Sequence, residues 1–589
     1  MNYIMFKDSK ILAVLAAAFF LAWLVLILNL RVIYVNISGL APLGMVNLLF
    51  PYFWIILVGF ITICFFTLKQ RDSPRWLHVL LLAQLSLMLY YTPFLLGGFS
   101  WSPDSLWHGG VADYMPSILS GSKFSLTEYA QSYPLSFLIT YGVESLFSLD
   151  VVMYTLYIFP PICIVLISTL AYFFASRTFN KRTAFLAMLL ALPALHYIEP
   201  HVSPFAMGTV LLLASLVLLT YKGAKATVSS LLLIVAVTLT HPISPIFLGI
   251  YLSVALLVSL LSRVNSVKLY TGSFFANLFL NIKPKVSPIR RKAFRLTILL
   301  LFLCALWFYW TIYQASPNYV GVEAPVSNVL DLTFLTNLMH VFEWTASGQG
   351  FIYPQISQLS LFVYAIFLVS TITIFMVNLF NFLRRRGRVE QSIPTLLTLT
   401  LTAIGSGVMS YLLFSSSGER FLLGRGLIFF LLMGSICIAT YLTGTTIKKS
   451  NLKTAIAFIF VIFLVCTFPI ISYSKEAYNT FTPSAESGLI FLSQNIDLSQ
   501  KTLSMTGDQQ LASYANLSKG LNLVGFPPNL SQPPGIIVLR VNSYYLLAMR
   551  YDLSLTQNTY TELCANLTEN QLYDKVYSNA KFEIYIRSF

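Results

Sequence analysis

Residues 11–29 read ILAVLAAAFFLAWLVLILN, a run without a charged side chain. A helix of about 20 apolar residues crosses the hydrocarbon core of a bilayer, so this stretch predicts a transmembrane helix. Lys7 and Lys10 precede the run and no small-residue cleavage site follows it, which predicts a retained signal anchor and not a removed signal peptide. Comparable runs recur as far as Ser472. The chain is therefore predicted to be a polytopic α-helical membrane protein.

The composition agrees with this class. Of the 589 residues, 57% are hydrophobic and only 10% are charged, and the mean hydropathy is +0.74. These values lie far outside the range of soluble domains. The net charge of +15 would fit a partner such as nucleic acid, but most of it lies in short loops between apolar runs, where the positive-inside rule accounts for it. Five of the six cysteines lie inside apolar runs, and no disulfide framework or zinc-ligand spacing is visible.

We expect about thirteen transmembrane helices, which places the N-terminus in the cytoplasm and the C-terminal tail outside. The expected spans are 11–29, 46–67, 76–97, 151–176, 183–198, 203–221, 227–242, 243–262, 297–314, 357–383, 393–414, 426–444 and 454–473.

Charged residues set this orientation. Of the 29 Lys and Arg residues before position 474, the arrangement places 25 on the cytoplasmic side, and it places ten of the 13 Asp and Glu residues outside. Cytoplasmic loops carry the excess of Lys and Arg in membrane proteins. The longest inner loop, from Arg263 to Arg295, holds eight basic and no acidic residues, which predicts contact with anionic lipid headgroups. All four Asn-x-Ser/Thr sequons fall outside: Asn36, Asn516, Asn529 and Asn566.

The apolar stretch from Pro134 to Phe147 tests the arrangement. It is about 14 residues long, which is short for a crossing. A crossing there would also move Arg177, Lys181 and Arg182 to the outer side. We therefore expect a juxtamembrane helix on the outer surface, inside a first outer loop of residues 98–150. A second outer loop is expected at 315–356, and both belong to a membrane domain of residues 1–473.

The composition changes after residue 473, and residues 474–589 predict a small extracytoplasmic α/β domain. About 115 residues are enough for a core of their own. Its expected helices are Ala485–Asn495 and Asn570–Tyr577. Its expected strands are Thr502–Met505, Leu521–Val524, Ile536–Val541 and Phe582–Ile586.

The first outer loop carries the polar residues that are most informative about function. Ser102, Pro103 and Asp104 are typical of the start of a helix. Asp104 and His108 are four residues apart and share a face of that helix. Its apolar stripe is typical of a helix that lies on a membrane: Trp107, Val111, Tyr114 and Ile118. A carboxylate that only complements the helix dipole is the alternative reading of Asp104.

These features resemble the GT-C superfamily, the membrane glycosyltransferases that use polyprenyl-phosphate-linked sugars. The resemblance is to protein O-mannosyltransferase-like enzymes and their archaeal relatives. It rests on Asp104 in the first large outer loop, a surface helix ending near Gly121, and a second one opening at Tyr133-Pro134. The helix end Thr240-His-Pro-Ile-Ser244 and the helix entry Gly418-Glu-Arg-Phe421 also occur in such chains. The Trp-Trp-Asp-type motif of oligosaccharyltransferase catalytic subunits is absent, which argues against transfer of a whole oligosaccharide.

The resemblance implies an inverting sugar transfer at the outer face, from a polyprenyl (dolichyl-type) phosphate to a glycan, lipid or protein acceptor. Asp104 maps to the catalytic acid of the family, and as a general base it would take the proton of an acceptor hydroxyl. Asp113 is the second catalytic candidate, either helping Asp104 or binding a divalent metal; a solvated helix face is its alternative. No cofactor is implied beyond that open question of a metal. The candidate substrate-binding residues are His108, His241, Glu419, Arg420 and Arg425.

Arg420 and Arg425 lie at the mouth of a predicted span, where a guanidinium can bind phosphate in bidentate fashion. Interfacial snorkelling is the alternative for both. The expected location is the plasma membrane of an archaeon or bacterium, and no nucleic-acid partner is expected.

A transporter or lipid flippase is the rival function. Transporters usually show paired repeats and charged or broken helices at mid-membrane. In this sequence the span interiors are nearly free of acids and bases, and the polar residues gather at one face, which favours chemistry at the surface. A scaffold whose membrane part has no activity is the third interpretation.

Overall fold

The structure is a computed structural model. It describes residues 9–36, 46–49, 51–70, 72–97, 104–121, 128–150, 153–195, 200–267, 288–311, 354–384, 392–417, 420–443 and 450–473 of the membrane domain, and residues 503–505, 523–525, 536–540, 573–578 and 582–587 of the C-terminal part.

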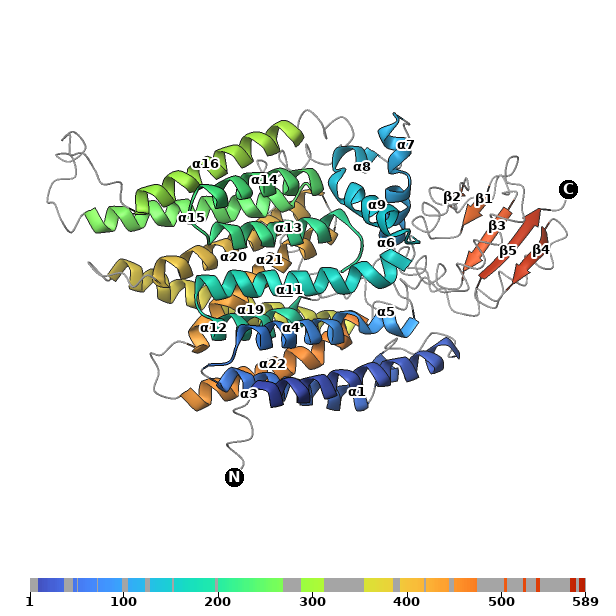
Figure 1. Cartoon of the computed structure of the whole chain (residues 1–589), viewed down its shortest axis with the longest axis horizontal. Coiled ribbons are helices and arrows are strands. Elements are labelled where there is room, and N and C mark those ends of the chain that lie inside the picture. The colour runs from blue at the N-terminus through green and yellow to red at the C-terminus, as the bar shows by residue number, and fades with distance from the viewer. Residues whose placement is uncertain are drawn as a thin grey trace, which may run out of the picture.

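Long helices pack side by side into one bundle (Figure 1). Among the described residues, nine helices are long and apolar enough to cross a membrane. They are α1 (Ser9–Asn36), α3 (Tyr52–Lys69), α11 (Phe159–Thr178), α15 (Ser244–Val267), α16 (Pro288–Tyr309), α19 (Pro354–Arg384), α20 (Ser392–Ser417), α21 (Arg420–Thr443) and α22 (Ser450–Tyr473).

Shorter helices occupy the other four predicted spans. They are α4 (Arg75–Tyr90), α12 (Lys181–Ala194), α13 (Pro204–Leu219) and α14 (Ala224–Thr240), of 14 to 17 residues. At 1.5 Å per residue they are roughly 21–26 Å long, less than the ~30 Å hydrocarbon core. Two short helices accompany the first spans, α2 (Val46–Leu49) and α5 (Thr92–Gly97). Each predicted span therefore contains a helix, but these four helices are shorter than the hydrocarbon core is thick.

Helix α12 lies in the core of the bundle. Asn180 caps its start by accepting a hydrogen bond from the Thr183 amide at 2.9 Å, and every residue from Thr183 to Ala194 is buried. It packs against α4, α11, α21 and α22. A helix that is apolar on all sides is stable only when it is surrounded. The outside of the bundle is also apolar, as expected for contact with lipid, with exposed side chains that include Leu21, Phe380 and Ile459.

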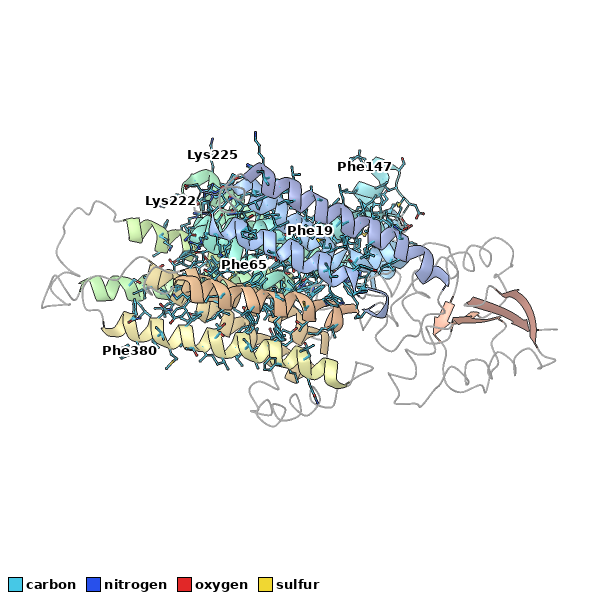
Figure 2. All side chains as sticks on the ribbon, turned by 90° about the horizontal axis from the view of Figure 1, so that it is seen from below. Phe19, Phe65, Phe147, Lys222, Lys225 and Phe380 are labelled. Carbon is cyan, nitrogen blue, oxygen red and sulfur yellow. The ribbon has the colours of Figure 1, made fainter. Side chains whose placement is uncertain are left out.

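The two ends of the bundle differ in character. Lys222 and Lys225 lie toward one end, and Phe147 at the end of the surface helix α9 (Leu135–Phe147) lies toward the other (Figure 2). In the predicted orientation, the end with Lys222 and Lys225 is the cytoplasmic one.

The C-terminal part contains a five-stranded sheet of order β2-β1-β3-β5-β4. Its strands are β1 (Leu503–Met505), β2 (Leu523–Gly525), β3 (Ile536–Arg540), β4 (Tyr573–Ser578) and β5 (Phe582–Arg587). β1 pairs in parallel with β2 and β3, whereas β5 pairs antiparallel with β3 and β4. All four strands expected from the sequence are present, with ends shifted by at most two residues.

One expectation for this part was wrong, and one is not addressed. The predicted helix Asn570–Tyr577 is replaced by strand β4. Tyr573, Val576 and Tyr577 favour a strand. β5 follows closely enough to pair with this segment in a hairpin, and that pairing decides its conformation. The predicted helix Ala485–Asn495 lies outside the described residues. The parallel strands β1, β2 and β3 need long crossover connections. The residues of these connections also lie outside the described residues.

Candidate functional site

Four short helices cover one end of the bundle: α6 (Asp104–Asp113), α7 (Met115–Leu119), α8 (Glu128–Ser132) and α9. In Figure 1 they lie at the end where the sheet is drawn. A single helix was expected from Asp104 to near Gly121, but the chain turns at Tyr114, which separates α6 from α7. Pro116 follows two residues later and cannot donate the next helical hydrogen bond, which explains the break. α9 begins directly after Pro134, as the sequence predicted.

Asp104 is the first residue of α6, and its side chain lies outside the described part of the structure. Ser105, the next residue, is fully buried, and His108, one turn along the helix from Asp104, is 6% exposed. Because α6 is continuous from Asp104 to Asp113, Asp104 and His108 do share a helix face. Asp113, at the other end of α6, is exposed.

The structure brings His108 together with a histidine from a distant part of the chain. The ring centroid of His108 lies 6.1 Å from that of His201 and 5.8 Å from that of Phe137 on α9. His201 is also buried, and it precedes α13, whose start Ser203 caps by accepting from the Ala206 amide at 3.1 Å. Two imidazoles therefore face the inner side of the surface helices.

His241 ends α14 and packs against the same first turns of α13. It is 1% exposed, and its ring meets that of Phe205 edge-on at 5.2 Å. Its Nδ1 accepts a hydrogen bond from the Ile243 amide at 3.2 Å, so a neutral ring carries its proton on Nε2. Gly208 makes this close approach possible, because a Cβ there would lie 3.2 Å from the Cβ of His241 and 2.5 Å from the Oγ of Ser244.

Two tryptophans, Trp307 in the last turn of α16 and Trp310 directly after that helix, hold this region together. The indole of Trp307 donates to the carbonyl of Pro242 at 3.1 Å, next to His241. The indole of Trp310 donates to the carbonyl of Ser132 at 2.7 Å, at the end of α8. The end of α16 thereby joins the His241 turn to the surface helices.

Sequence reasoning missed Glu144. It lies on α9, is 4% exposed, and neither carboxyl oxygen has a hydrogen-bond partner among the described residues. Burial, followed by the nearby charges of Asp113 and Asp150, raises the pKa of this carboxyl to about 8. The sequence did contain a signal, because Phe137, Thr140 and Glu144 recur at helical spacing and form the buried face of α9.

Of the remaining candidates, Arg420 and Arg425 are placed by their backbone alone. α21 begins at Arg420, in agreement with the predicted helix entry, and Arg425 follows in its second turn. Both side chains lie outside the described part, and so does Glu419. The described residues contain no group of three or more His, Cys, Asp or Glu side chains that could hold a metal ion.

No protein-family model and no curated protein matches the chain. Solved structures of similar shape include the oligosaccharyltransferase of Archaeoglobus fulgidus in complex with zinc and sulfate, with 13% identity, 87% of this chain and 73% of that chain covered, and a TM-score of 0.46. AglB from the same archaeon, in complex with an inhibitory peptide and a dolichol-phosphate, is 12% identical, with 87% of this chain and 74% of that chain covered and a TM-score of 0.45. ArnT from Cupriavidus metallidurans, bound to undecaprenyl phosphate, is 13% identical, with 86% of this chain and 97% of that chain covered and a TM-score of 0.45.

At identities near 13% and TM-scores below 0.5, these likenesses assign no function to this chain.

Proposed function

We propose that the chain is a GT-C-type glycosyltransferase that moves a sugar from a polyprenyl phosphate to an acceptor at the outer membrane face. One observation carries the proposal. At one end of an apolar bundle, the helix that starts at Asp104 buries Ser105 and His108, and the ring of His108 lies 6.1 Å from that of His201. Polar groups at a membrane face are costly to collect unless they serve a site.

The proposed reaction is a single inverting displacement. The oxygen of an acceptor hydroxyl forms a bond to the anomeric carbon, while the bond from that carbon to the phosphate oxygen breaks. The carboxylate of Asp104 takes the hydroxyl proton as general base, and the polyprenyl phosphate leaves with the electron pair of the broken bond. His108, one turn along α6, holds the carboxylate in orientation for this transfer.

The leaving phosphate needs donors of hydrogen bonds. We assign this role to His241: its Nδ1 accepts a hydrogen bond from the Ile243 amide, so a neutral ring carries its proton on Nε2, the atom that would donate to the phosphate. Arg420 and Arg425 add positive charge from the first turns of α21, and Glu419 precedes them. Asp113 lies at the other end of α6, about 13 Å along the helix from Asp104, so a divalent metal bound by Asp113 would be separate from the general base.

The proposed topology has thirteen crossings, in which the four shorter helices cross beside the nine longer ones. The N-terminus is then cytoplasmic, and the sheet belongs to an extracytoplasmic α/β domain of residues 474–589. This puts the surface helices α6–α9 and the histidines on the outer side, where a polyprenyl-phosphate sugar is reached from the membrane.

The test is transfer by the purified protein in vesicles that contain a polyprenyl-phosphate sugar labelled in its sugar. We expect the label to move to an acceptor, with free polyprenyl phosphate as the second product. If labelled lipid crosses the bilayer with its sugar–phosphate bond intact, and no transfer occurs, the protein is a flippase and the proposal is wrong.

A further inference from the structure

The surface helices have a hydrophobic core of their own. Val111, Ala112 and Met115 pack with Ala130 and Phe137 in a cluster separate from the main core of the bundle. The main core begins again at Tyr154 in the π-helical turn η3 (Tyr154–Ile158), which leads into α11. Helices α6–α9 are therefore packed as a unit that covers the end of the bundle.

The surface helices and η3 also carry buried polar side chains, which we call the polar seam; on α9 they accompany Val143, which packs against the main core. The polar seam consists of Ser105 on α6, Ser136 and Glu144 on α9, and Thr155 on η3, and each is at most 4% exposed. Helix α6 contacts both α9 and η3, so the four belong to adjoining elements. Their side-chain oxygens have no hydrogen-bond partner among the described residues.

Such groups are rare in folded proteins, because more than nine in ten buried polar atoms are hydrogen-bonded. A buried hydroxyl or carboxyl without a partner loses its hydration and gains nothing in return. Water reaches these atoms as soon as the surface helices move away from the bundle. The closed arrangement therefore carries a penalty in the polar seam that an open one does not.

We propose that α6–α9 form a lid that opens along the polar seam and carries Asp104 with it. The lid's own core keeps the four helices together, and the hydrogen bond from Trp310 to Ser132 attaches α8 to the bundle in the closed arrangement. Opening admits substrate to the end of the bundle, and closure brings the first residue of α6 to the reacting groups. The role of Asp104 rests on the proposed function, whereas the opening itself does not.

A backbone position with positive φ lies at the end of the lid. Ser148 follows α9 at φ 51°, and this is where such a unit would bend. Gly121, at φ +94°, follows α7 inside the lid.

The test is amide hydrogen exchange of α9 in the whole protein, held in lipid nanodiscs. Thr155→Val keeps the shape of the side chain and removes its unpartnered hydroxyl, and Glu144→Met does the same for the carboxyl. Each change removes a penalty that only the closed state bears. We expect each variant to slow exchange of the α9 amides about tenfold, while exchange in α12 stays the same.

Thr238→Val is the matched control. Its hydroxyl is equally buried but donates to the carbonyl of Ile234 at 2.9 Å, so its removal is expected to leave α9 exchange unchanged. A lid along the polar seam is ruled out if Thr155→Val and Glu144→Met leave α9 exchange unchanged or speed it up. Because exchange is measured without substrate, an inactive protein or a dispensable Asp104 would leave this result intact.

Discussion

The indole nitrogen of Trp310 donates a hydrogen bond of 2.7 Å to the carbonyl of Ser132, joining residues 178 positions apart. Ser132 ends α8, and Tyr133-Pro134 then opens α9. Trp307 in the last turn of α16 also fixes the turn after His241, so both halves of the candidate site are attached to the end of α16.

Trp310→Phe removes the donor and keeps most of the ring. We expect a loss of about 1 kcal/mol of stability, because the Ser132 carbonyl is left without this partner. Thermal unfolding and amide exchange of α8 would show it, with faster exchange confined to α8 and α9. Unchanged exchange in both helices would mean that this bond does not hold the surface helices.

His241 can be tested with two substitutions that separate its nitrogens. Asn presents an oxygen near the position of Nδ1 and keeps the turn to Ile243, but it has no donor where Nε2 lies. We expect His241→Asn to keep the stability and to raise the KM for the polyprenyl-phosphate donor about tenfold or more, since a hydrogen bond to a charged group is worth ~1.5–3 kcal/mol.

His241→Gln should do the opposite, because its amide reaches toward the Nε2 position but leaves the Ile243 amide without its acceptor. Its stability is expected to fall by about 1 kcal/mol while the donor KM changes less. If both variants bind the donor as the parent protein does, His241 serves only to end its helix.

Gly208→Ala tests the packing around His241. The added Cβ would lie 2.5 Å from the Ser244 hydroxyl, and Ser244 is fully buried. Such overpacking costs about 1–3 kcal/mol. Adding Ser244→Ala should restore a large part of this loss in a double-mutant cycle, measured by thermal unfolding; strictly additive effects would contradict the close contact.

Glu144 predicts a dependence of stability on pH. Its pKa is about 8 in the folded protein against an ordinary value of 4.5, because it is buried near Asp113 and Asp150, with Tyr154 facing it from η3. A raised carboxyl pKa means that the folded state holds the proton more tightly. Stability is therefore fully present below pH 4.5, falls between 4.5 and about 8, and levels off above.

The variant Glu144→Gln has no ionisable group at this position, so its stability does not fall between pH 4.5 and about 8. The difference in melting temperature between the two proteins is expected to grow across that pH window in favour of the variant. Parallel curves for the two proteins would show that Glu144 ionises normally.

Patterns along the chain predicted the parts of the structure that depend on local sequence. Hydropathy predicted the position of each span, and the structure has a helix there. Pro134 predicted the start of α9. Asn570–Tyr577 was misassigned because pairing with β5 decides its conformation, and that pairing is a property of the folded sheet.

The site was less predictable for the same reason. Asp104, His108 and His241 stand in recognisable motifs, but the meeting of His108 with His201 depends on how α6 packs near α13. Glu144 carries no motif, and only tertiary burial makes it unusual.

The central claim is tested most directly by Asp104→Asn in the labelled transfer assay, beside Asp72→Asn, the same change at an exposed position near the basic end of the bundle. Removal of a general base is expected to cost about 10²–10⁴-fold in rate. The account predicts such a loss in kcat for Asp104→Asn, with normal insertion, unchanged melting temperature and full activity of Asp72→Asn. Transfer by Asp104→Asn at the rate of the parent protein would contradict it.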